Sequence, residues 1–190
     1  MSQKYDTGLM WFRRDLRVSD NATLHHALIS CRQVHCVFVF DKDILADLPR
    51  VDRRVEFIRE SLQELDGALR ALSGHPQAGL IVRHAVACEE IVYLAQALKA
   101  QAVFAGRDYE PQALNRDEQV RGALASAGIV FETCKDQVIF ERRDILTQSG
   151  TVYGVFTPYK NNWLSRLEPH HLLAGDAHFG AGPGPARTDP

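Results

Sequence analysis

Two groups of charged side chains follow short apolar runs and could bind a ligand. They are Arg13, Arg14 and Asp15 in the first group, and Asp108 and Glu110 in the second. Guanidinium groups suit carboxylates and phosphates, and carboxylates accept charge-assisted hydrogen bonds from N–H and O–H groups. If the fold brings the two groups together, the sequence predicts a site for a polar ligand.

The first group also has a purely structural interpretation. Asp15 could form an ion pair with Arg14 or Arg17 and hold together the turn that follows the apolar run. For Asp15 this structural role is favoured over a binding role. For Asp108 and Glu110 a binding role is favoured, with both carboxylates exposed to the site rather than sealed in the core.

The elements that must position these residues follow from hydrophobic periodicity. Strands are predicted at residues 8–12, 34–40, 79–85, 102–106 and 129–134. Amphipathic segments lie between these runs, and the clearest has apolar residues at spacings of three and four from Val55 to Leu72. Alternation of strand and helix predicts a parallel sheet with helices on both faces.

The predicted fold is α/β: a doubly wound, Rossmann-like parallel sheet of about five strands with the order 3-2-1-4-5. In such sheets ligands bind outside the carboxyl ends of the strands, where the strand order reverses. Both charged groups follow strands that flank this point, so we expect them to face each other across one crevice.

Composition limits the class of protein. Lys and Arg total 22 against 24 Asp and Glu, which gives a net charge of −2. A general nucleic-acid or membrane-surface binder needs a basic excess, so both classes are disfavoured. The four cysteines form no C-x-x-C pair and are expected to be reduced and buried. Without an apolar run long enough for a signal peptide or membrane span, we expect a cytoplasmic protein.

Several familiar chemical motifs are absent from the sequence. It has no G-x-G-x-x-G, no G-x-x-x-x-G-K-[ST], no G-x-S-x-G and no H-E-x-x-H. The usual dinucleotide, triphosphate and hydrolase interpretations therefore lose support. No Cys/His spacing suits zinc, and no metal site is predicted.

Five longer motifs follow one another along the chain. They are W-F-R-R-D-L-R-x-x-D-N-x-x-L (11–24), F-D-K-D-I-L (40–45), D-R-R-V-E-F-I (52–58), D-Y-E-P followed by R-D (108–117), and Y-G-V-F-T-P-Y-K-N-N-W (153–163). In this order they resemble the motifs of DNA photolyases and cryptochromes. Each motif alone is weak. Together they cover nearly the whole chain up to a Gly- and Pro-rich end.

The resemblance implies a two-domain protein. In this family an N-terminal α/β domain holds a light-harvesting antenna chromophore. A C-terminal helical domain holds FAD, which repairs pyrimidine dimers in flipped-out DNA lesions. Residues 1–175 resemble the antenna domain, and 176–190 resemble an interdomain linker. The FAD domain is absent from these 190 residues, so we expect the chain alone to be inactive in repair.

The resemblance also implies roles for particular residues. Asp108 and Glu110 match acidic positions that deazaflavin-type members use, beside Arg13, Arg14 and Asp15. Phe40 and Asp41 could pack against and orient the chromophore ring. Arg54 matches an arginine of that crevice and could hold a polar tail or phosphate, or could equally be a solvated helix-face charge.

The nature of the chromophore is partly indicated by one departure from the family pattern. Folate-binding members carry an Asn-Glu pair where this chain has Gln112 and Ala113. A deazaflavin or flavin nucleotide is therefore favoured over a folate, and an empty antenna site is the remaining alternative. The segment 153–163 is expected to pack onto the core.

Three functions remain open at this point. The first is the antenna domain of a photolyase, whose partners are its own FAD domain and, through it, damaged DNA. The second is the same domain in a cryptochrome photoreceptor. The third is a stand-alone nucleotide-binding module. No membrane partner is expected.

Overall fold

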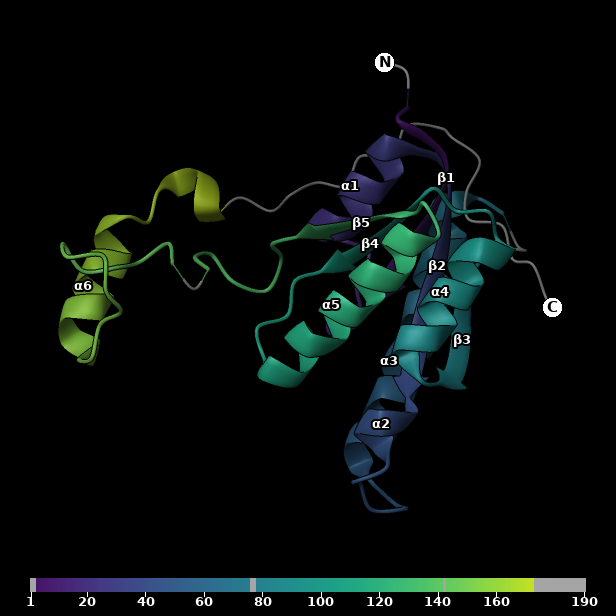
Figure 1. Cartoon of the computed structure of the whole chain (residues 1–190), viewed down its shortest axis with the longest axis horizontal. Coiled ribbons are helices and arrows are strands. Elements are labelled where there is room, and N and C mark those ends of the chain that lie inside the picture. The colour runs from purple at the N-terminus through teal and green to yellow at the C-terminus, as the bar shows by residue number, and fades with distance from the viewer. Residues whose placement is uncertain (1–2, 76–77, 142, 173–190) are drawn as a thin grey trace.

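The computed structural model describes residues 3–75, 78–141 and 143–172 and contains a five-stranded parallel sheet (Figure 1). The strand order β3-β2-β1-β4-β5 confirms the predicted order. All four neighbouring pairs are parallel. The strands are β1 (Tyr5–Phe12), β2 (Cys31–Asp41), β3 (Leu80–Ala85), β4 (Ala102–Gly106) and β5 (Val130–Cys134).

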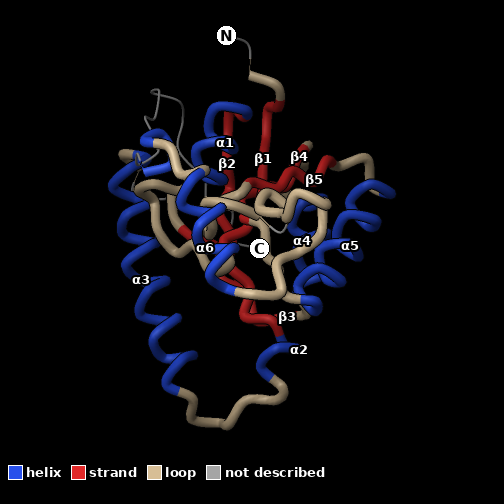
Figure 2. Tube along the Cα trace, turned by 90° about the vertical axis from the view of Figure 1, so that its left-hand side faces the viewer, coloured by secondary structure: helices blue, strands red, loops and turns tan. Residues whose placement is uncertain are grey.

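Helices connect successive strands, as predicted, and three further helical elements were not predicted. The connecting helices are α1 (Ala22–Ser30), α3 (Arg53–Ser73), α4 (Ala87–Ala97) and α5 (Pro111–Ser126). The additional elements are α2 (Lys42–Leu45), α6 (Phe156–Ser165) and a 3-10 helix, Pro169–Leu172. Figure 2 shows α3 on one side of the sheet and α4 and α5 on the other.

The core has two layers, because successive side chains of a strand point to opposite faces. Leu9 and Trp11 of β1 pack with α4 and α5. Met10 and Phe12 pack with α1 and α3. All four side chains are buried, which explains why this strand reads as a continuous apolar run rather than an alternating one.

Helix ends follow local capping rules. The side chain of Asn21 accepts a hydrogen bond of 2.9 Å from the N–H of Leu24 at the start of α1. Asp52 does the same for Arg54 at the start of α3. Helix α3 ends at Gly74, whose φ of +68° is the left-handed conformation that glycine adopts without strain. These caps fix where each helix leaves the strand before it.

The segment around α6 does not pack onto the core, and that prediction was wrong. No residue of α6 is buried, and Phe156 is 72% exposed. Figure 1 shows α6 standing away from the sheet. The extension packs on itself instead: the rings of Phe140 and Trp163 lie 5.4 Å apart, and Asn162 donates to the hydroxyl of Tyr153.

The four cysteines are free, as predicted, but only Cys31 and Cys36 are buried; Cys88 and Cys134 are half-buried. Among the described helices, none is long and apolar enough to cross a bilayer. The linker predicted at 176–190 lies outside the described residues.

Candidate functional site

A cavity of about 630 Å³ opens at the carboxyl ends of β1, β2 and β4, and we call it the strand-end cavity. This volume lies within the range of small-molecule sites, and the position is the expected switch point of the sheet. Apolar and aromatic side chains form part of its wall, among them Trp11, Phe38, Phe40, Ile44 and Ile58.

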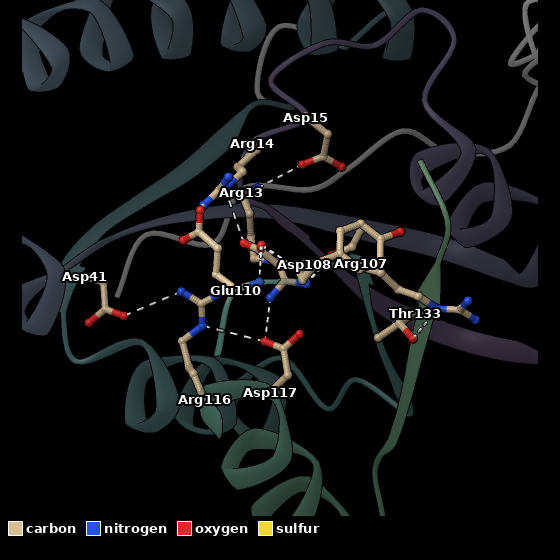
Figure 3. Close-up of polar contacts among 12 residues, drawn as sticks. Arg13, Arg14, Asp15, Asp41, Arg107, Asp108, Glu110, Arg116, Asp117 and Thr133 are labelled. Carbon is tan, nitrogen blue, oxygen red and sulfur yellow. Dashed lines mark hydrogen bonds and ion pairs between the residues drawn. The ribbon is translucent and has the colours of Figure 1, made fainter. Parts of the chain in front are cut away.

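Most of the predicted site residues line this cavity. They are Arg13, Arg14, Phe40, Asp41, Asp108 and Glu110. The two charged groups that are about 95 positions apart in the sequence do meet there, as Figure 3 shows. Asp15 and Arg54 are not among the lining residues.

Asp15 is a structural residue of the turn after β1. Its carboxylate accepts the N–H of Arg13 at 3.0 Å, and the side-chain amide of Asn21 donates to its carbonyl oxygen at 3.1 Å. Burial raises the pKa of Asp15. A side chain at Gly106 would bring its Cβ to 3.2 Å from this carboxylate, so the glycine lets β4 approach the turn.

The predicted ion pair of Asp15 with Arg14 or Arg17 was wrong. Arg17 pairs with Asp136 at 2.9 Å. Arg14 instead reaches across to the second charged group. The charge cluster is therefore an ion-pair network, but its partners come from distant parts of the chain.

Arg54 lies at the first turn of α3 and pairs with its neighbour Asp52 at 2.6 Å. The Arg54 side chain is 71% exposed. The hydrogen bonds between the two raise the pKa of Arg54 and lower the pKa of Asp52 to about 2. This geometry matches the solvated helix-face alternative rather than a wall of the cavity.

Arg14 joins the two acidic residues of the cavity wall. Its Nε lies 3.3 Å from Oδ2 of Asp108, and its Nη2 lies 2.8 Å from Oε1 of Glu110. The hydrogen bond with Glu110 raises the pKa of Arg14. Glu110 is exposed, but Asp108 is buried, contrary to the expectation for it. Asp108 also accepts the N–H of Tyr109 at 2.8 Å, which fixes the turn after β4.

Asp41 and Phe40 end β2 at the cavity. The carboxylate of Asp41 accepts the N–H of Asp43 and the N–H of Ala87, each at 3.3 Å. It thereby ties the starts of α2 and α4 to the sheet. The ring of Phe40 packs edge-on against Phe38 at a centroid distance of 5.0 Å.

The sequence interpretation missed three residues that complete the site: Trp11, Arg116 and Asp117. Arg13 pairs with Asp117 at 2.5 Å and also donates to the carbonyl oxygen of Gly106. The guanidinium groups of Arg13 and Arg116 lie 4.8 and 5.1 Å from the centre of the Trp11 ring. The R-D pair of the fourth motif was the signal that could have found Arg116 and Asp117.

A second hollow, of about 460 Å³, adjoins the first, and Asp108 lines both. Glu141 there accepts from Arg107 at 2.7 Å and from the hydroxyl of Tyr109 at 3.0 Å. Burial and the nearby Glu141 raise the pKa of Tyr109 to about 12. These contacts attach the segment after β5 to the turn after β4.

Comparison with known proteins places this geometry in one family. The family model described as DNA photolyase matches residues 8–177. A deoxyribodipyrimidine photo-lyase of Synechococcus sp. is 36% identical over 168 residues, which are 85% of this chain and 32% of that protein. Cryptochromes also occur among the curated relatives.

Two solved structures extend the likeness to three dimensions. A bacterial class III photolyase from Agrobacterium tumefaciens aligns with a TM-score of 0.76 at 26% identity, over 90% of this chain and 34% of that one. An archaeal photolyase from Sulfolobus tokodaii, solved with two FAD molecules, aligns with a TM-score of 0.68 at 29% identity, over 85% and 35%. The chain thus spans about a third of the length of these relatives. Sequence motifs, strand order and family match agree, and the chain belongs to the DNA photolyase family.

Proposed function

We propose that the strand-end cavity binds an antenna chromophore, and that the chain is the light-harvesting domain of a photolyase. One observation supports this most directly. An aromatic-walled cavity of about 630 Å³ lies at the switch point of the sheet, among charged groups that could orient a polar ring. The structure of the Sulfolobus photolyase carries a second FAD and is described as implying a novel light-harvesting cofactor.

The residues of the cavity fit a flavin-like ring. Phe40 offers an apolar ring, while Glu110 offers an exposed carboxylate to N–H or O–H donors. Gln112 and Ala113 line the cavity where folate-binding members of the family carry an Asn-Glu pair. A deazaflavin or flavin nucleotide therefore fits better than a folate. The bound chromophore would supply absorption of near-UV or blue light, and the protein would supply position and orientation.

A pair of variants at one lining residue tests the cavity. Cys88 is half-buried and lines it, with its sulfur 3.3 Å from the side-chain oxygen of Gln119. Cys88→Trp should fill the cavity and abolish binding of riboflavin or FMN, followed by flavin fluorescence. Cys88→Ser should bind like wild type. Equal flavin binding by the folded Trp variant and wild type would reject this cavity as the site.

We propose that the whole protein uses this domain in light-driven repair of pyrimidine dimers, with FAD held in a C-terminal domain. These 190 residues alone should then not repair dimers. They should also not bind DNA appreciably, because a net charge of −2 gives little counterion release on binding. Light-dependent repair of a dimer-containing oligonucleotide by this chain would contradict that division of labour. The alternative is a cryptochrome role, which the cryptochromes among its relatives support. Dimer repair by a longer protein that contains this domain would favour the photolyase role over the cryptochrome role.

A further inference from the structure

Arg116 is the one arginine of the strand-end cavity that has no carboxylate within hydrogen-bond distance among the described residues. Its side chain is only 15% exposed. Its Nε is buried and has no hydrogen-bond partner. The nearest carboxylates, those of Asp117 and Asp41, lie 3.6 and 4.0 Å away, beyond hydrogen-bond distance. A guanidinium carries five N–H donors, and the donor on Nε of Arg116 is buried without an acceptor.

The other two arginines of the cavity are different. Arg13 pairs with Asp117 at 2.5 Å, and Arg14 pairs with Glu110 at 2.8 Å. Each thus has a close carboxylate partner within the chain. The Nε of Arg13 is also buried without a hydrogen-bond partner, but only Arg116 of the three lacks a close carboxylate among the described residues.

The environment of Arg116 is unfavourable for a charge. Burial, followed by the nearby charge of Arg13, lowers the pKa of Arg116. The charges of Asp117, Asp41 and Asp108 partly offset this effect. The centre of the Trp11 ring lies 5.1 Å from the guanidinium carbon and adds a cation–π contact. Buried polar groups without partners cost free energy, so a mostly buried arginine beside a cavity suits an acceptor that arrives from outside the chain.

We propose that Arg116 recognises a neutral carbonyl oxygen on the ring of the ligand held in the strand-end cavity. This assignment rests on the proposed function of that cavity. A carbonyl oxygen accepts one or two N–H groups from the guanidinium and adds no charge. Riboflavin and FMN share such carbonyl groups on their ring, whereas only FMN carries a phosphate.

The charge of the cavity wall favours a carbonyl over a phosphate. The lining contains three arginines, Arg13, Arg14 and Arg116, against the five acids Asp41, Asp43, Asp47, Asp108 and Glu110. A phosphate beside Arg116 would also lie near Asp41, which is 4.0 Å from the guanidinium. Like charges oppose such a placement, while a neutral acceptor avoids the repulsion.

The test compares Arg116→Met with wild type in the 190-residue chain, with Arg121→Gln as the control. Arg121 lies on the same helix, is outside the strand-end cavity and has a side chain 46% exposed. Riboflavin and FMN are titrated separately against each protein. Wild type should bind both with similar affinity, and Arg116→Met should weaken both by about ten- to a hundredfold. Arg121→Gln should bind like wild type.

Thermal unfolding without ligand separates recognition from structural support. Because Arg116 is poorly satisfied, Arg116→Met should leave the melting temperature within about 3 °C of wild type or raise it. Flavin added in excess should raise the melting temperature of wild type and Arg121→Gln more than that of Arg116→Met.

Each contrary result has its own meaning. If wild type binds neither flavin, the flavin assignment of the cavity fails, and the Arg116 assignment fails with it. If wild type binds but Arg116→Met binds equally well, only the Arg116 assignment fails. If FMN binds at least tenfold more tightly than riboflavin and the variant removes that difference, Arg116 holds a phosphate and the carbonyl assignment is overturned. A lower ligand-free melting temperature with unchanged binding would make Arg116 a structural residue.

Discussion

Two charged clusters lie on opposite faces of the sheet and hold their central ion in different ways. On the face of α1, the carboxylate of Glu132 receives hydrogen bonds from Lys4, Tyr5 and His26 at 2.6–2.8 Å. On the face of α5, Arg116 has ion pairs of 3.6 Å and longer. The first cluster completes its hydrogen bonds within the chain, and the second leaves donors open beside a cavity.

The difference separates charge that supports the fold from charge available for a ligand. Burial opposes ionisation of Glu132, but the hydrogen bonds from Lys4, His26 and Tyr5 lower its pKa from 4.5 to about 2. At Arg116 the effect of burial outweighs that of the nearby carboxylates, and the pKa of the guanidinium is lowered. Loss of the central ion should therefore harm stability in the first cluster and ligand binding in the second.

The largest expected effect is that of Glu132→Ala. The hydroxyl of Tyr5 and the ring nitrogen of His26 would lose their acceptor in a partly buried place. We expect a loss of about 2–3 kcal/mol in the free energy of unfolding, measured by urea denaturation. Glu118→Ala is the control, because that side chain is 80% exposed and should stay within about 0.5 kcal/mol of wild type. Equal effects of the two variants would contradict the comparison.

The pH dependence of stability gives a second test of the same cluster. The pKa of Glu132 is about 2 in the folded protein and 4.5 as its ordinary value. This stabilisation is therefore complete above pH 4.5 and is lost as the pH falls toward 2. Allowing for solvent screening, the loss should be about 1–2 kcal/mol. Urea denaturation at pH 6 and at pH 3 measures it, and Glu132→Gln should show a shallower decline over that interval. Parallel declines would show that other carboxylates dominate.

Asp108→Ala should have a smaller but clear effect on stability. Asp108 is buried, accepts the N–H of Tyr109 at 2.8 Å and lies 3.3 Å from Arg14. Loss of that acceptor at a tight turn should lower the free energy of unfolding by about 1–2 kcal/mol. Asp108→Asn keeps an acceptor oxygen and should recover part of the loss. If Asp108→Ala is neutral, the turn does not depend on this carboxylate.

Much of the fold could be predicted from the sequence. The strand β4 was predicted with its observed bounds, because a short, wholly buried strand reads as an unbroken apolar run. The segment that forms α6 was misinterpreted for a related reason. Its aromatic residues indicate apolar surface to be covered, but a pattern cannot say which partner covers it, and Phe156 is exposed here.

The site was only partly predictable, since hydrogen-bond partners depend on the tertiary structure. The two charged groups were expected at one crevice, and they meet there. The motif contained Arg116, but nothing local shows that its donors remain unmet. Asp15 looked like a partner for neighbouring arginines, yet it bonds the N–H of Arg13 because the turn folds back on it.

The smallest expected effect on stability is that of Glu110→Ala. This variant sharpens the contrast between the two acids of the cavity wall, exposed Glu110 and buried Asp108. Its side chain is 63% exposed, and its ion pair with Arg14 involves a guanidinium that is 51% exposed. Exposed ion pairs contribute little, so the free energy of unfolding should change by no more than about 0.5 kcal/mol.

Ligand binding should respond differently to the same change. If Glu110 accepts a hydrogen bond from the chromophore, its loss should weaken riboflavin binding by roughly tenfold, whereas Glu118→Ala, on the exposed side of α5, should leave binding unchanged. Asp108→Ala would perturb both quantities, because that carboxylate fixes the turn as well as the cavity wall. Glu110 therefore isolates the binding role of the acidic pair. Unchanged binding by Glu110→Ala, in a protein whose Arg116→Met variant has lost binding, would assign ligand recognition to the arginine alone.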